Sequence, residues 1–394
     1  MQFSVGTNYW PRRSALEMWR RFDPGEIGED FARIAALELD TVRLFLRWDD
    51  FQPHPETIDP VMLDRLESVA SLAAERGLRT VPVLCNGHNS GVNWLPQWAL
   101  EPSGSRAKNL YGGDLLDAQS RFARAVGDRL RGHPGVFAWD IGHAFTDVSQ
   151  PPRGKLRTGG HETESIGARE AAQWSRRLTD VLKDASGFPC TAGTFSADIT
   201  EERNLRLESL CVPFAFASMQ GSSMTVTFAR NRLDPEVVPF LAMVAASFSR
   251  KPVLVSGFGN PTCPAQKLSL FERFPLPGES YETVSPDDPL FAAYPCLSED
   301  ENAAYCTSVL ERLHADGRLG AYWWCWADNP GFYGIIRNDG SEKPVAAALS
   351  AFARERRTVV PPADMPMISS AYYYRTLPAS AQTLYDAFLG SVSR

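Results

Sequence analysis

Asp140 and His143 have the side-chain types and the spacing best suited to proton-transfer chemistry. They lie three positions apart in the run Val136–Phe145, whose apolar and aromatic composition is typical of a β-strand. An imidazole exchanges protons near neutral pH, and a nearby carboxylate can act as its acid/base partner. The structural alternatives stay open. Asp140 would be a buried aspartate bonded to backbone or to Arg43, and His143 would fill space or hydrogen-bond a ligand.

Strand geometry gives an expectation for which of these side chains lie together. Residues two and four positions apart in an extended strand point to the same face, so Asp140, Gly142 and Ala144 are expected to share the inward face. Asp140 is therefore the best remaining carboxylate of this segment, and His143 is the first candidate for an acid/base group.

Further polar residues follow other strand-like runs. His88 stands between Gly87 and Asn89, a polar setting that suits ligand contact, although loop carbonyls could equally hold a structural histidine. Asp49 and Asp50 follow the run 40–46, and one of them is expected to face a ligand. His88, His143 and Asp140 could in principle form a facial metal triad, but nothing in their spacing requires one. No metal or other cofactor is therefore expected.

Tryptophan is concentrated near the ends of strand-like runs. Aromatic faces stack on the C–H faces of sugars and on planar hydrophobic ligands alike. Alternation is expected to place Trp324 and Trp326 on one face, with one or two tryptophans lining a site and the rest packed under helices. The tryptophans concerned are Trp10, Trp48, Trp94, Trp98, Trp323, Trp324 and Trp326.

Composition excludes several classes of partner. The 394 residues carry a formal net charge of −7, which disfavours binding to nucleic acid or anionic lipid. No apolar run approaches the length of a membrane span. The seven cysteines form no CxxC pair, and the chain opens without the features of a signal peptide, so reduced thiols in the cytoplasm are expected. A Cys263–Cys296 disulfide remains a minor alternative.

The elements that must position these residues alternate between strand and helix. Such alternation is typical of βα units with a parallel sheet, and eight units favour a closed (β/α)8 TIM barrel over an open sheet. No GxGxxG follows the first strand, which argues against a dinucleotide fold. The predicted strands are 3–8, 40–46, 78–85, 135–142, 188–194, 210–218, 252–258 and 319–326. The predicted helices are 28–38, 60–76, 114–131, 167–185, 200–208, 235–249, 298–315 and 343–356.

The long connections all follow strands. The segments 86–113, 145–166 and 259–297 therefore mark the C-terminal face, where barrel enzymes place their sites. Residues 357–394 contain Pro361-Pro362 and an expected helix at 379–392. We expect a barrel over 1–356 with this short C-terminal extension packed on it.

Taken in order, these runs resemble the clan A glycoside hydrolases, closest to family 5 and its relatives, over about residues 1–356. The matching segments are Gly6-Thr-Asn8-Tyr9-Trp10, Val42-Arg43-Leu-Phe, Gly87-His88-Asn89 with Asn93-Trp94, and Tyr322-Trp323-Trp324-Cys325-Trp326. The resemblance implies that Asn8, Tyr9, Arg43, His88, Asn89, Trp94, Trp324 and Trp326 line a sugar site, with Arg43 beside the nucleophile.

The resemblance breaks at the residues that perform the family's chemistry. In those relatives strand four ends in Asn-Glu, where the glutamate is the acid/base, but this chain has His143-Ala144. Strand seven usually ends in the nucleophilic glutamate before Phe-Gly, but this chain has Gly257. On strand six, Gln220 and Ser222 stand where the relatives offer His and Tyr. Engineering would not normally change the Asn and His positions as well, which favours natural loss.

Two carboxyl groups are needed for either retaining or inverting hydrolysis, and alanine and glycine can neither attack nor titrate. The sequence therefore predicts a glycosidase-fold protein that binds a sugar or another polar small molecule without ordinary hydrolysis. A repurposed enzyme that uses His143 and Asp140 for cyclisation, elimination or isomerisation is the alternative. A purely structural or partner-binding barrel ranks below both.

Overall fold

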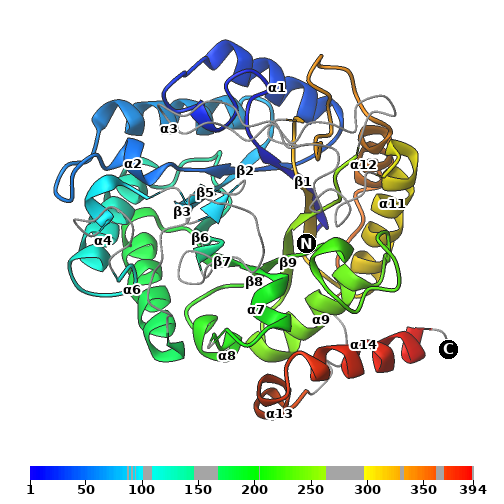
Figure 1. Ribbon diagram of the computed structural model, residues 1–394. Coiled ribbons are helices and arrows are strands. Elements are labelled where there is room, and N and C mark those ends of the chain that lie inside the picture. The colour runs from blue at the N-terminus through cyan, green and yellow to red at the C-terminus, as the bar shows by residue number, and fades with distance from the viewer. Residues whose placement is uncertain are drawn as a thin grey trace, which may run out of the picture.

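The chain folds into a closed ring of parallel strands surrounded by helices. The computed structural model describes residues 1–86, 88–89, 92–93, 95–100, 109–145, 167–203, 205–262, 297–328, 332–360 and 368–392. Among these residues the ring runs β1-β10-β9-β8-β7-β6-β3-β2, and every neighbouring pair is parallel. Figure 1 shows the helices arranged around these strands. The (β/α)8 TIM barrel expected from the sequence is confirmed.

The barrel strands are short and mostly buried. They are β1 (Ser4–Tyr9), β2 (Thr41–Phe45), β3 (Arg79–Asn86), β6 (Trp139–His143), β7 (Cys190–Phe195), β8 (Ala217–Gln220), β9 (Val253–Phe258) and β10 (Gly320–Trp323). A separate two-stranded antiparallel sheet pairs β4 (His88–Asn89) with β5 (Val92–Asn93).

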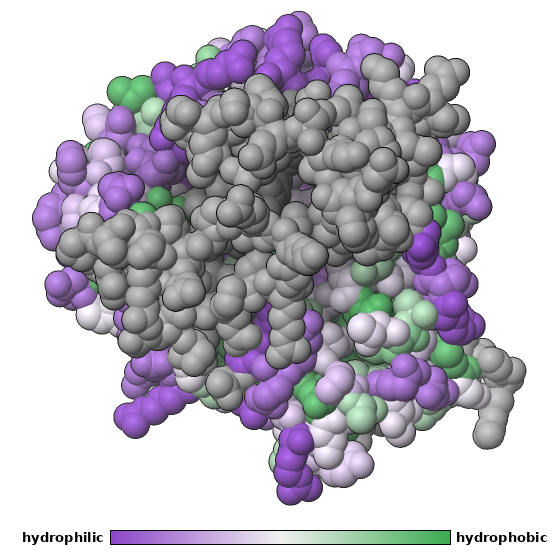
Figure 2. Space-filling model, viewed as in Figure 1, coloured by the Kyte–Doolittle hydropathy of each residue, from purple (hydrophilic) through white to green (hydrophobic). Residues whose placement is uncertain are grey.

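The helices that follow these strands cover the outside of the ring. The longer ones are α1 (Pro24–Ala36), α3 (Pro60–Ala74), α4 (Gly113–Arg129), α6 (Ala168–Ser186), α9 (Val237–Ser249), α11 (Glu299–Ala315) and α12 (Pro344–Arg354). The shorter ones are η1 (Ala15–Glu17), α2 (Trp48–Phe51), η2 (Gln97–Ala99), α7 (Ser196–Thr200), α8 (Leu207–Leu210) and η3 (Ser223–Thr225). In Figure 2 polar side chains predominate over α1, at the top of the view.

Local sequence signals explain several helix boundaries. Asp59 caps α3 by accepting from the backbone N–H of Val61 and Met62, with Pro60 at the first helical position. Ser298 and Glu301 form the capping box that begins α11.

Three predicted segments are clearly wrong in their bounds. The predicted helix 200–208 is not one helix, because α7 ends at Thr200 and α8 begins only at Leu207. The predicted strand 210–218 begins in the structure only at Ala217, because Leu210 ends α8 and Phe214 and Phe216 are buried outside any strand. The predicted strand 319–326 ends at Trp323, which removes strand alternation from the tryptophans that follow it.

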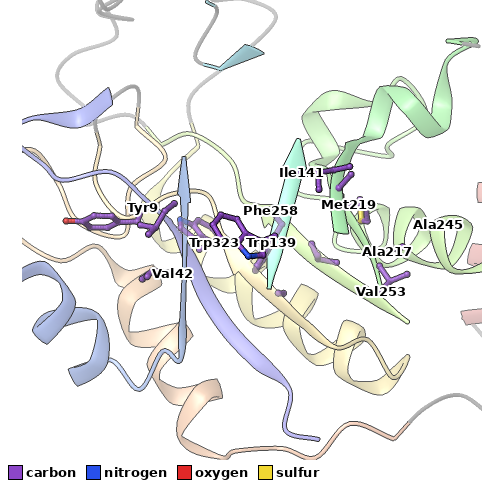
Figure 3. Close-up of a cluster of buried hydrophobic side chains, with 14 of the residues drawn as sticks. Tyr9, Val42, Trp139, Ile141, Ala217, Met219, Ala245, Val253, Phe258 and Trp323 are labelled. Carbon is purple, nitrogen blue, oxygen red and sulfur yellow. The ribbon is translucent and has the colours of Figure 1, made fainter. Parts of the chain in front are cut away.

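Side chains on the two faces of each strand build separate layers of core. On β2, Val42 and Leu44 pack outward with the helices, whereas Arg43 and Phe45 point into the barrel. Figure 3 shows part of the outer layer, to which Trp139 and Ile141 of β6 and Met219 of β8 contribute. Alternation therefore decides which residues can reach the barrel interior.

The C-terminal segment forms two helices, α13 (Ser370–Arg375) and α14 (Ala379–Val392). Tyr385 of α14 packs against Phe240 of α9, with ring centroids 5.1 Å apart, and its hydroxyl donates to buried Asp234 at 2.7 Å. All residues of α9 are buried, because it is covered on the barrel side and on the side of α14.

No helix in the described ranges is long and apolar enough to cross a membrane. Five cysteines (Cys85, Cys190, Cys211, Cys306 and Cys325) are free and buried. The Cys263–Cys296 alternative lies outside the described residues.

Candidate functional site

A buried ion pair crosses the interior of the barrel. Arg43 of β2 donates from Nε and Nη2 to Oδ2 of Asp140 on β6, at 3.0 and 2.7 Å, and both side chains are fully buried. Oδ1 of Asp140 accepts from the backbone N–H of Gly142 and of Gly193, at 3.1 and 3.0 Å. Burial raises the pKa of the Asp140 carboxyl, while Arg43 and the two backbone donors act to lower it.

The remaining donors of Arg43 are held by neighbours on other strands. Its Nη1 donates to Oδ1 of Asn8 at 2.9 Å, and Nδ2 of Asn8 donates to the carbonyl of Ser256 at 2.8 Å. A Cβ atom on Gly193 would lie 2.8 Å from Nη2 of Arg43, so glycine at this position makes room for the guanidinium. The fixed pair braces β1, β2, β6, β7 and β9.

His143 adjoins the same guanidinium. Its Nδ1 lies 2.7 Å from Nε2 of Gln220 and 3.4 Å from both Nη1 and Nη2 of Arg43. A guanidinium has only donors, so Nδ1 is best placed as the acceptor of this group. The proton of the neutral ring is then carried by Nε2.

Aromatic rings surround the imidazole. The ring of Trp324 stacks on His143 with a 5.3 Å centroid separation and an interplanar angle of 5°. Phe45 and Phe195 meet it edge-on at 4.9 and 5.1 Å. His143 is only 1% exposed, whereas Trp324 is partly exposed. Trp324 and Phe195 are thus the two members of this cluster that are partly exposed, and Trp324 is the one stacked on the imidazole.

No carboxylate occupies either of the two positions singled out by the resemblance. Ala144 directly follows β6, is 1% exposed and has a φ of 47°. Gly257 on β9 pairs in register with Gln220 on β8. A Cβ atom on Gly257 would lie 2.8 Å from Oε1 of Gln220 and 3.1 Å from its Cγ and Cδ. The side chain of Gln220 therefore fills the space beside Gly257.

The expectation that Asp140, Gly142 and Ala144 share one face is wrong for Gly142. A Cβ atom there would meet Trp174 of α6 at 2.8 Å, which places this position on the helix side of the strand. The pairing of β6 with β7 shifts register between Asp140 and His143. Such an irregularity reorients the residues that follow it, which explains why Asp140 and His143 both point inward.

Three predicted site residues contact partners outside this cluster. Tyr9 points outward, and its hydroxyl donates to Asp30 of α1 at 3.1 Å. Trp326 is fully buried, and the guanidinium of Arg33 on α1 lies over its ring. Asp49 accepts from Arg20 and Arg47, at 2.9 and 2.8 Å.

The structure thus brings Asn8, Arg43, Asp140, His143, Gln220 and Trp324 together, with Ala144 and Gly257 beside them. Trp94 and the side chains of His88 and Asn89 lie outside the described residues; the backbone of His88 and Asn89 forms β4. No group of three potential metal ligands occurs among the residues that the structure describes.

Sequence reasoning missed Gly193, Phe45 and Phe195. A glycine inside the predicted strand 188–194 was a signal for a close approach of another group. Phe45 lies two positions after Arg43 and therefore shares its face. Alternation also separates Asn8 from Tyr9, because consecutive strand residues cannot both face the interior.

No family model and no curated protein matches this chain. Solved structures do match. A GH5_18 protein from Streptomyces cattleya, a glutamate-to-alanine variant in complex with Manβ1-4GlcNAc, has a TM-score of 0.79 at 21% identity and covers 98% of this chain and 90% of its own.

Two other matches are similar in kind. A GH5_18 protein from Bifidobacterium longum subsp. longum gives a TM-score of 0.73 at 18% identity over 92% of this chain and 81% of its own. The exo-β-1,4-mannosidase Op5Man5 from an Opitutaceae bacterium gives 0.69 at 23% identity over 90% and 60%. This chain therefore shares the eight-stranded barrel fold of the GH5_18 glycoside hydrolases.

Proposed function

We propose that this protein binds a sugar or glycoside at the C-terminal ends of its barrel strands and does not hydrolyse it by the two-carboxylate route. The proposal rests mainly on what surrounds Gly257, which has no side chain and lies against the side chain of Gln220. A glutamate there would need the space that Gln220 fills, and Gln220 is itself hydrogen-bonded to His143. The proposed absence of a carboxylate at this position thus agrees with the Gln220 side chain that occupies the adjoining space.

The surviving carboxylate supports the same conclusion. Asp140 accepts two hydrogen bonds from Arg43 and two from backbone N–H groups, so its oxygens are occupied by structural partners. A nucleophile or general base needs an oxygen that reaches the substrate. Asp140 is fully buried in the barrel and is better suited to bracing the strands.

Ligand binding is supported by the aromatic and amide groups around the site. Trp324 is partly exposed and held flat by His143, an arrangement that suits stacking on a sugar ring. Among the fold neighbours, a GH5_18 variant with alanine in place of a glutamate is described in complex with Manβ1-4GlcNAc. A barrel of this fold with such a substitution is therefore compatible with a bound disaccharide.

A repurposed acid/base enzyme is the second candidate, because His143 and Asp140 remain adjacent and both contact Arg43. In that case His143→Asn would abolish turnover of the metabolite while the protein still folds and binds. The engagement of Nδ1 and of both Asp140 oxygens favours the binding function.

Calorimetric titration with mannose, GlcNAc and Manβ1-4GlcNAc, alongside aryl-glycoside hydrolysis assays, tests the proposal. We expect saturable binding without turnover. Trp324→Ala should weaken binding about tenfold or more, because it removes the stacking surface. Tyr372→Ala on exposed α13 is the matched aromatic control and should leave binding unchanged.

Chemical rescue distinguishes a binding protein from a hydrolase that lacks only its catalytic carboxylate. Formate or azide restores turnover when it can enter the space left by a missing carboxylate. Gln220 fills that space beside Gly257, so no rescue is expected. Glycoside cleavage by the unaltered protein, or the lack of any saccharide binding, would contradict the proposal.

A further inference from the structure

Gln220 contacts both of the features that distinguish this site from a two-carboxylate site. Its side chain lies over Gly257, and its Nε2 lies 2.7 Å from Nδ1 of His143. His143 in turn stacks on Trp324. The buried amide of Gln220 thus connects Gly257 on β9, through His143, to the partly exposed ring of Trp324.

The contacts of Nδ1 favour one protonation state of the His143 ring. Gln220 on β8 and Arg43 on β2 both direct N–H groups at Nδ1, and a proton added there would face the guanidinium at 3.4 Å. Asp140 on β6 neutralises Arg43 through its own bonds to the guanidinium. Nδ1 is therefore placed as the acceptor of a neutral ring, and the described residues Arg43, Asp140, His143 and Gln220 together carry no net charge.

We infer that Gln220 takes the place of a carboxylate at position 257 and, acting through His143, positions Trp324 beside described side chains of no net charge, so that the site takes neutral saccharides and rejects cationic sugar analogues. This rests on the proposed function, since it names the ligand class of the same site. Gln220 and His143 are positioning residues here, because Trp324 is the group placed to contact the ligand.

Electrostatics explains the selectivity. In a site with two carboxyl groups, a protonated amine in the ligand gains a charged partner, and such an interaction strengthens as water is excluded. In this chain the corresponding partner is a neutral amide. A cationic ligand would lose its hydration without gaining an opposite charge, whereas a neutral sugar brings no charge that must be desolvated.

The first experiment needs no ligand. The emission of Trp324 is obtained by subtracting the spectrum of Trp324→Phe from that of the full protein between pH 5.5 and 8.5. We expect it to be independent of pH, because the stacked imidazole stays neutral. Gln220→Glu places a carboxylate beside Nδ1, which should favour a stacked imidazolium and quench Trp324 until alkaline pH removes the proton.

A matched variant separates shape from hydrogen bonding. Gln220→Leu keeps the bulk over Gly257 but cannot donate to Nδ1, so the Trp324 emission should change although the protein melts cooperatively. Gln220→Met serves the same purpose if the leucine variant does not fold. Wild-type emission that titrates like that of Gln220→Glu, or emission unaltered in every variant, overturns the inference.

The second experiment compares mannose with 1-deoxymannojirimycin, which carries a protonated ring nitrogen. We expect the unaltered protein to bind mannose at least about tenfold more tightly, and Gln220→Glu to reverse that order. Tighter binding of the cation by the unaltered protein overturns the ligand class. If neither compound nor any other saccharide binds, the proposed function fails, and the ligand-free fluorescence test still decides the role of Gln220.

Discussion

Gln220 and Gly257 are register partners on adjacent strands, and the side chain of the first lies where a side chain on the second would begin. This relationship means that the two positions cannot be altered independently. It also provides the sharpest test of whether Gln220 and Gly257 are packed as a pair.

Restoring a side chain at position 257 should be costly by itself. Gly257→Ala places a methyl group 2.8 Å from Oε1 of Gln220, so the amide must leave His143 or the strands must shift. We expect a loss of about 1–3 kcal/mol in the free energy of unfolding, measured by urea denaturation. The same substitution in a Gln220→Ala background should cost much less; equal costs in both backgrounds would contradict the packing described here.

Breaking the central ion pair should be strongly destabilising. Arg43→Met leaves Asp140 buried without its main partner, and a loss of about 3–5 kcal/mol is expected. The double variant Arg43→Met/Asp140→Leu removes both charges and should recover part of that loss. Additive effects in this double-mutant cycle would show that the two residues do not stabilise each other.

Asp30 should make stability depend on pH. Burial raises the pKa of Asp30 to about 6, despite the hydrogen bond from Tyr9 that acts to lower it. The unfolded chain has a lower pKa, so this stabilising contribution is fully present below about pH 4 and is lost as pH rises towards 6.

Asp30→Asn removes that dependence and keeps an acceptor for Tyr9. Relative to the unaltered protein, the variant should gain about 2–3 kcal/mol between pH 4 and pH 7.5, as an order of magnitude. Urea denaturation at several pH values measures the difference. An identical pH profile for the two proteins would show that Asp30 does not titrate in this range.

The C-terminal helices should contribute to stability through Tyr385. We propose that residues 357–394 form an extension of the barrel, anchored where the Tyr385 hydroxyl donates to Asp234. Tyr385→Phe leaves one acceptor of a buried carboxylate without this donor and should cost about 1–3 kcal/mol. Tyr372, 59% exposed on the same extension, is the control, and Tyr372→Phe should change stability by less than about 0.5 kcal/mol.

Much of the scaffold could be predicted from the sequence, because alternating strand and helix signals are local. The run 252–258 and the helix 379–392 lie within a residue of β9 and α14. The prediction of a strand over 210–218 was wrong for most of its length, because these apolar residues are buried in the core without forming a strand before Ala217. A short apolar run has the same composition whether it is buried as a strand or as an irregular segment, so composition alone does not distinguish the two.

The site was less predictable, because its geometry depends on interactions between strands. The gathering of Arg43, Asp140, His143 and Gln220 follows from their inward-facing positions on the barrel strands β2, β6 and β8. The register shift in β6 and the occupation of the space at Gly257 by Gln220 depend on pairings that no single run of residues contains. Tyr9 and Trp326 show the opposite error, since proximity in sequence to a site residue does not place a side chain on the same face.

The Arg43–Asp140 pair has a wider consequence for how such a protein can evolve. Its bonds join strands that are distant in the chain, and none of them depends on the residues at positions 144 and 257. Reactivity and architecture are therefore encoded by separate side chains in this barrel. Substitutions at positions 144 and 257 therefore leave the bonds of the Arg43–Asp140 pair, and with them the links between these strands, unchanged.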